Sequence, residues 1–289
     1  MVKIKSLSLI SMMFSDLDRN RTNAPLCSVE NFVKNGFFLF KQSDFKKEVK
    51  QEHLKEYLES IHSLKSRVKE FLELDRDIKQ KFHSETRDFI FQENGYFPGL
   101  WSVSAYDDRD EKVDFCLEYL ISNNFYDPTQ AEMFLHPDFA DRDRVETYKH
   151  LLPNQEARQV CDFLDRYVLS RIRQELTTKL TLDLPLNCLQ IQVAYYPEQA
   201  SLSKHTDSSF LQANIGPTEN LTIYPLQSSE PITISLEVGE VILYTGRDFK
   251  KKLNFAKDKL PNPLPHQVQA KKGRTSILAA CFAKEDNVF

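Results

Sequence analysis

The fold class of this chain is decided by residues 189–195, which read LQIQVAY. Bulky apolar residues occupy every second position, and polar or small residues stand between them. Because successive side chains of a β-strand point to opposite faces, this spacing predicts a strand with one face against a core. The stretch follows Pro185, where the spacing of apolar residues changes from helical to period two.

Further short strands are predicted on the C-terminal side of this stretch. They cover residues 221–224, 232–236, 241–244, 267–270 and 275–282. Turn signals such as Gly216-Pro217 and Lys272-Gly273 separate them. Several short strands at this spacing are typical of an antiparallel sandwich or barrel.

The earlier part of the chain has helical spacing instead. Between residues 44 and 82 apolar residues recur at gaps of three to five, which predicts a long amphipathic helix with at most one break. A second helix is predicted over residues 154–179, with Asn154 as its N-cap. We therefore expect a mainly β protein with flanking helices. It divides into a helix-rich region over 1–153 and a core helix with the strand-rich region over 154–289.

The composition narrows the class of protein. Lysine and arginine (38) nearly balance aspartate and glutamate (42), and the resulting net charge of -4 argues against a nucleic-acid partner. No apolar run is long enough to cross a bilayer, so no membrane partner is expected either. Residues 7–14 form an apolar run that serines interrupt, which favours a buried first strand over a secretion signal.

Cysteine and glycine usage point to the compartment and exclude nucleotide sites. The five cysteines contain no CxxC pair, which favours free thiols in a reducing cytoplasm. Secretion into the cytosol of another cell would leave the same signature, and that alternative stays open. The seven glycines form no GxGxxG or P-loop motif. We expect a cytoplasmic protein that acts as a monomer.

Three polar residues of the last third have the chemistry of a metal site. Residues i and i+2 of a strand face the same side, so His205 and Asp207 can converge on one point. A third ligand must come from elsewhere in the sheet, and His266 opens a predicted strand after a proline-rich turn. Two imidazoles and one carboxylate can hold a divalent iron on one face and leave the opposite face open.

A second pair of polar residues lies on the strand that follows. Arg274 and Ser276 are again i and i+2, so they face the same way. An arginine with a hydroxyl partner can clamp a carboxylate. Beside an open iron face, this clamp suggests an oxygenase whose co-substrate is an organic acid.

Several short motifs resemble those of a known family. They are Asn35-Gly36-Phe37-Phe38, Gly95-Tyr96-Phe97-Pro98, Tyr195-Tyr196-Pro197 and Gly239-Glu240 before an apolar strand. Together with the order of the polar residues described above, they resemble the iron(II)/2-oxoglutarate-dependent oxygenases, in the branch that includes isopenicillin N synthase. The resemblance implies a double-stranded β-helix, or jelly-roll, core behind a helix-rich N-terminal part.

The resemblance also implies roles for individual residues. The positions that match the iron ligands of the family are His205, Asp207 and His266. The positions that match its 2-oxoglutarate carboxylate site are Arg274, Ser276 and Tyr196. The implied activity uses Fe(II), 2-oxoglutarate and dioxygen to hydroxylate, desaturate or cyclise a small molecule such as a specialised metabolite.

Three alternatives stay open on the sequence. The first is an iron and dioxygen oxidase of the same fold that does not use 2-oxoglutarate, because such oxidases keep the arginine-serine pair. The second is a non-catalytic binding module, and the third is a three-ligand zinc hydrolase. The substrate pocket is also open: Tyr96, Trp101 and Tyr106 suit a pocket wall or core packing, and Lys204 and residues 250–252 suit an anionic substrate or a solvated loop.

Overall fold

The computed structural model describes residues 26–73, 75, 101–104, 112–117, 154–182, 186–196, 201–207, 209–228, 230–252, 260–269 and 274–283. The strands in these ranges are β1 (Phe37–Phe40), β2 (Trp101–Ser104), β3 (Lys112–Leu117), β4 (Leu186–Tyr196), β5 (Ser201–His205), β6 (Leu211–Ile215), β7 (Thr218–Ile223), β8 (Ile232–Leu236), β9 (Val241–Thr245), β10 (His266–Gln269) and β11 (Arg274–Ala283). The helices are α2 (Val29–Asn35), α3 (Gln42–Phe45), α4 (Gln51–Leu72), α7 (Asn154–Phe163), the π-helix η4 (Leu164–Leu169), α8 (Ser170–Leu180) and α9 (Arg247–Lys252).

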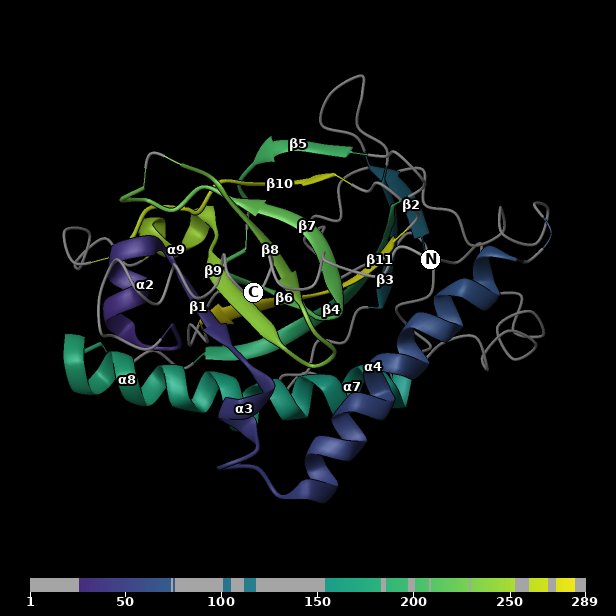
Figure 1. Ribbon diagram of the computed structural model, residues 1–289, viewed down its shortest axis with the longest axis horizontal. Helices are drawn as coiled ribbons and strands as arrows, with labels where there is room; N and C mark the ends of the chain where they lie inside the picture. The colour runs from purple at the N-terminus through teal and green to yellow at the C-terminus, as the bar shows by residue number, and fades with distance from the viewer. Residues whose placement is uncertain are drawn as a thin grey trace, which may run out of the picture.

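The strands form two antiparallel sheets (Figure 1). The larger has the order β1-β9-β6-β11-β4-β3-β2, and the smaller has the order β5-β10-β7-β8. From β4 to β11 the chain passes back and forth between them, because β4, β6, β9 and β11 lie in one sheet and β5, β7, β8 and β10 in the other. This alternation is the double-stranded β-helix, and it confirms the predicted fold class.

Most predicted elements are present, with shifted ends. The stretch 189–195 lies within β4, and β8 has the predicted bounds 232–236. The predicted helix 154–179 runs from Asn154 to Leu180 and contains a π-helical segment, η4. The helix expected from residue 44 begins only at Gln51, after the short α3. Residues 7–14, Tyr96 and Tyr106 lie outside the described residues.

Three strands of the larger sheet, β1, β6 and β9, are buried on both faces, and the described side chains of the sheet alternate between two apolar clusters. On β9, Val241 and Leu243 join the cluster that contacts the helices, whereas Ile242 and Tyr244 point into the space between the sheets. The period-two rule for strands requires this alternation. It also places Arg274 and Ser276 on the inner face of β11, together with Leu278, because Ile277 packs toward the helices.

Helices cover the outer face of the larger sheet. Figure 1 shows α7 and α8 running beneath it, with α4 crossing α7. Contacts join α7 and η4 to β4, and α4 to α7, β4 and β11. The helices therefore leave the space between the two sheets uncovered, and the predicted site residues lie on or next to the strands that face this space.

One aromatic stack joins α4 to α7. The ring of Phe163 lies parallel to that of Tyr57 at 3.8 Å between centroids, and it meets Phe45 edge-on at 5.3 Å. Replacing Phe163 by alanine should lower the free energy of unfolding by about 3–5 kcal/mol, because it leaves a cavity between packed helices. Urea unfolding followed by circular dichroism measures this loss. Gln155→Ala, at an exposed position of the same helix, should leave the unfolding midpoint unchanged, and an equally small effect of Phe163→Ala would contradict the packing described.

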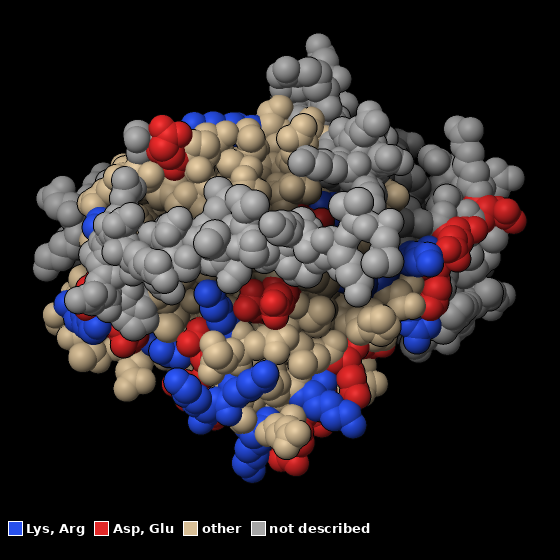
Figure 2. Space-filling view, viewed as in Figure 1, with Lys and Arg blue, Asp and Glu red and all other residues tan. Residues whose placement is uncertain are grey.

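The described surface carries both signs of charge. Figure 2 shows Lys and Arg side chains interleaved with Asp and Glu over the described part of this face. Several form ion pairs along α4, such as Lys55 with Glu59 at 3.7 Å and Lys69 with Glu73 at 4.0 Å. None of the described helices combines the length and the apolar content that a bilayer crossing would require.

Candidate metal centre

The two predicted imidazole ligands face each other across neighbouring strands. β5 pairs with β10, and His205 and His266 are direct partners in that ladder. Their ring centroids are 4.3 Å apart. The carboxylate of Asp207 reaches both rings, with Oδ1 at 3.5 Å from Nε2 of His205 and Oδ2 at 3.5 Å from Nε2 of His266. One ligand atom from each residue lies within 4.8 Å of the other two.

The expectation that His205 and Asp207 share a strand is wrong in detail. β5 ends at His205, and Asp207 lies in the loop that follows. The carbonyl oxygen of Asp207 accepts a hydrogen bond from the amide of Arg247 at 2.8 Å, which ties this loop to the start of α9. The two side chains converge because the loop is fixed, not because of strand alternation.

Backbone carbonyl groups orient both imidazoles. Nδ1 of His205 is 2.7 Å from the oxygen of Ser203, and Nδ1 of His266 is 3.2 Å from the oxygen of Leu264. A carbonyl oxygen can only accept, so Nδ1 carries the proton in each ring. The unprotonated Nε2 of each ring then faces Asp207, the arrangement that metal-binding histidines require. Three such donors, without a thiolate, could hold a divalent metal.

The predicted carboxylate clamp lies across the barrel, in the other sheet. On β11, the guanidinium Nη2 of Arg274 donates to Oγ of Ser276 at 2.7 Å. The same Oγ is 3.2 Å from the hydroxyl of Thr218 at the start of β7. The guanidinium also lies over the ring of Tyr196, its direct partner on β4, at 5.1 Å. The structure therefore brings the three predicted clamp residues together and adds Thr218, which the sequence did not indicate.

Two hydrogen-bond donors of the clamp are unpaired among the described residues. Nε and Nη1 of Arg274 are buried and have no hydrogen-bond partner among the described residues. Burial lowers the pKa of Arg274, while electrostatic interactions with Tyr196 and Glu219 oppose that shift. Buried polar groups are nearly always paired in native proteins. Two orphaned donors on one cation therefore mark a place for an anion.

Tyr244 lies between the metal cluster and the clamp. Its hydroxyl is 3.3 Å from Nε2 of His266, hydrogen bonds to Asp207 and accepts from Nδ2 of Asn214 at 2.7 Å. Burial raises the pKa of Tyr244 far above its usual value, and the charge of Asp207 raises it further. The hydroxyl is thus protonated, donates to the carboxylate and holds it in place. Asn214 and Tyr244 were not predicted, although both occupy inward positions of period-two strands.

Removing this hydroxyl tests its role. Tyr244→Phe should weaken divalent-metal binding about 10-fold, because partners of metal ligands contribute on that scale. A titration with Co(II) measures the affinity. Tyr57→Phe is a matched control, since this buried hydroxyl donates to the carbonyl oxygen of Gly239 at 3.3 Å and lies outside the metal cluster. Equal affinities of the two variants would show that the hydroxyl does not support Asp207.

Residues proposed for the substrate pocket are only partly described. Trp101 lies in β2. Lys204 is exposed, and its ammonium lies 3.8 Å from the ring centroid of Tyr224. Residues 250–252 belong to α9.

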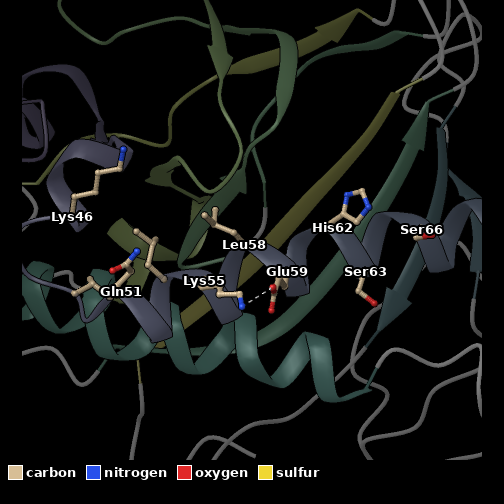
Figure 3. A pocket seen from close by; sticks show the side chains of 10 residues that line it. Lys46, Gln51, Lys55, Leu58, Glu59, His62, Ser63 and Ser66 are labelled. Carbon is tan, nitrogen blue, oxygen red and sulfur yellow. Dashed lines mark ion pairs between the residues drawn. The ribbon is translucent and has the colours of Figure 1, made fainter.

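A separate groove runs along α4 (Figure 3). Its lining includes Leu54, Leu58, His62 and Ser66, which lie on one stripe of the helix at spacing i, i+4. No residue of the metal cluster or the clamp lines this groove. The chemistry described above is therefore assigned to the barrel interior and not to the groove.

Comparison with solved structures identifies the fold. No family model and no curated protein matches this chain in sequence. The structure of JOX2 in complex with 2-oxoglutarate, iron and JA is 15% identical over 89% of this chain and 71% of that chain, with a TM-score of 0.57. A dioxygenase for auxin oxidation in rice is 15% identical over 88% of this chain and 75% of that one, with a TM-score of 0.52. A full-length Neurospora crassa protein in complex with 2-oxoglutarate and 5-formyluracil is 13% identical over 89% and 78%, with a TM-score of 0.54.

Identities this low establish a common fold and leave function to be argued from the site. This chain has the jelly-roll fold of the 2-oxoglutarate-dependent dioxygenases.

Proposed function

We propose that this protein is a non-haem iron(II) oxygenase that couples oxidative decarboxylation of 2-oxoglutarate to oxidation of a small organic molecule. One observation carries the proposal. A cluster of two imidazoles and a carboxylate lies in the same barrel as a buried arginine with two unpaired donors. The first set of groups suits iron, and the second suits a carboxylate.

The donor set favours iron over zinc. Protein zinc sites often contain thiolates, whereas two histidines and one carboxylate with open positions are typical of non-haem Fe(II) oxygenases. Cys281, on β11, packs toward the helices and away from the barrel interior. In this proposal His205, Asp207 and His266 bind the iron.

The remaining residues bind and orient the co-substrate. Arg274 and Ser276 hold the distal carboxylate of 2-oxoglutarate, and Tyr196 supports it from the neighbouring strand. Iron and 2-oxoglutarate held by these residues would supply the activation of dioxygen, in which one oxygen atom enters succinate as carbon dioxide is lost and the other oxidises the substrate. The apolar side chains between the sheets, such as Leu221, Ile223 and Val268, exclude water from that chemistry.

The substrate is proposed only as a class. Proteins of similar fold form complexes with JA and with 5-formyluracil, which supports a small organic molecule here. Hydroxylation, desaturation and ring closure all fit the site. We further propose a cytoplasmic monomer of the isopenicillin N synthase-like branch, in which residues 1–153 support a catalytic region over 154–289.

Succinate formation tests the proposal. The protein, loaded with Fe(II) and given 2-oxoglutarate and dioxygen, should release succinate, and a library of small metabolites should contain compounds that accelerate the release. Consumption of dioxygen with product but no succinate would instead identify an oxidase of the same fold. Neither product nor succinate with any compound would favour a binding module.

A further inference from the structure

Lys65 joins the N-terminal helix α4 to both sheets of the barrel. Its ammonium group donates to the carbonyl oxygen of Pro217 at 2.7 Å and to that of Thr275 at 2.8 Å. Pro217 precedes β7 in the smaller sheet, and Thr275 lies in β11 of the larger one. Other lysines of α4 behave differently, since the side chains of Lys55 and Lys69 are 73% and 78% exposed.

The two carbonyl groups belong to the backbone of the carboxylate clamp. Thr275 stands between Arg274 and Ser276, so its carbonyl fixes the strand that carries both. Pro217 stands directly before Thr218, whose hydroxyl contacts Oγ of Ser276. One ammonium group therefore holds the two backbone segments from which the clamp side chains extend.

Electrostatics couples Lys65 to the same clamp. Burial lowers the pKa of Lys65 to about 8, and the charge of Arg274 contributes to that shift. The carboxylate that acts on Arg274 is that of Glu219, whose side chain is exposed. An anion at Arg274 would offset the repulsion between the two cations. Coupling between sites is reciprocal, so the charge of Lys65 must then favour anion binding by the same free energy.

We propose that Lys65 is a positioning residue of the clamp, and that a dicarboxylate at Arg274 and the docking of α4 through Lys65 stabilise each other. This inference rests on the proposed function, because the dicarboxylate is 2-oxoglutarate. It assigns α4, which lies more than 130 residues before the metal cluster in the sequence, a role in co-substrate binding.

Anaerobic calorimetry of 2-oxoglutarate binding to the Fe(II)-loaded full chain tests the inference. Lys65→Met should bind about 10-fold more weakly, within the usual range of coupling between sites. Lys65→Arg, which keeps the charge and the donors, should recover part of the loss. Lys69→Met, one turn further along α4, is the matched control and should bind like the wild type.

A second measurement needs no variant. Adding 2-oxoglutarate to the wild-type protein should slow amide hydrogen exchange in α4 around residues 61–69 as well as in β11. Protection that stays within the strands would overturn the coupling. This measurement decides the question if Lys65→Met does not fold.

The possible outcomes distinguish the proposed role of Lys65 from the proposed use of 2-oxoglutarate. A wild-type protein that does not bind 2-oxoglutarate overturns both. A wild-type protein that binds it, with Lys65→Met of equal affinity, overturns the role of Lys65 alone. A lowered unfolding midpoint of Lys65→Met with unchanged affinity would show that Lys65 only anchors the helix.

Discussion

Asp207→Ala should lose iron and, with it, all succinate formation. Asp207 is the one carboxylate of the cluster, and its two oxygens each lie 3.5 Å from an imidazole Nε2. The alanine variant leaves two neutral imidazoles, which cannot balance the charge of a divalent ion. Loss of a supporting partner costs about 10–100-fold in metal affinity, so loss of a ligand should exceed that range.

Metal analysis after anaerobic purification measures this effect directly. The wild type should carry close to one iron per chain and Asp207→Ala almost none. Asp162→Ala, at an exposed position of α7, is the control for iron lost during purification, and it should carry as much iron as the wild type. A variant that retains the wild-type amount of iron would show that Asp207 is not a ligand.

Arg274→Met should abolish 2-oxoglutarate binding while iron binding persists. Each hydrogen bond to a charged group contributes about 1.5–3 kcal/mol, so the two orphaned donors together account for about 3 kcal/mol or more, a factor above about 100 in affinity. Arg274→Lys should recover little, because a compact ammonium group cannot reproduce the several fixed donor directions of a guanidinium.

The same substitution should have the opposite effect on the protein without ligand. Removing a buried cation with two unpaired donors relieves a desolvation cost, so the thermal midpoint of Arg274→Met without 2-oxoglutarate should match or exceed that of the wild type. Calorimetric titration and thermal unfolding measure the two effects, with the exposed Arg158→Met as control. Tight 2-oxoglutarate binding by Arg274→Met would contradict the assignment of the clamp.

The sheet strands were predictable where apolar residues alternate clearly. The segments that became β4 and β8 have such alternation, and they were found. β11 was also found, although residues 277–283 form a continuous apolar run. β6 was not predicted, although Leu211, Ala213 and Ile215 alternate with Gln212 and Asn214. Its inward residues, Gln212 and Asn214, are polar and buried.

The grouping of His205, Asp207 and His266 was predictable from their residue types and order, whereas the residues that contact this cluster were not. Tyr244 and Asn214 reach the cluster only through the pairing of β6 with β9. Lys65 reaches the clamp from a helix whose pattern indicates only an amphipathic surface. The contacts of Tyr244, Asn214 and Lys65 depend on which strands and helices become neighbours. The sequence alone does not show that arrangement.

The central claim is that one barrel holds iron and 2-oxoglutarate together. Its most direct test is the visible absorption of the protein when Fe(II) and 2-oxoglutarate are added without dioxygen. A charge-transfer band that needs both additions, and that is lost in His266→Ala, is the predicted result. The absence of that band in the wild-type protein would contradict the account.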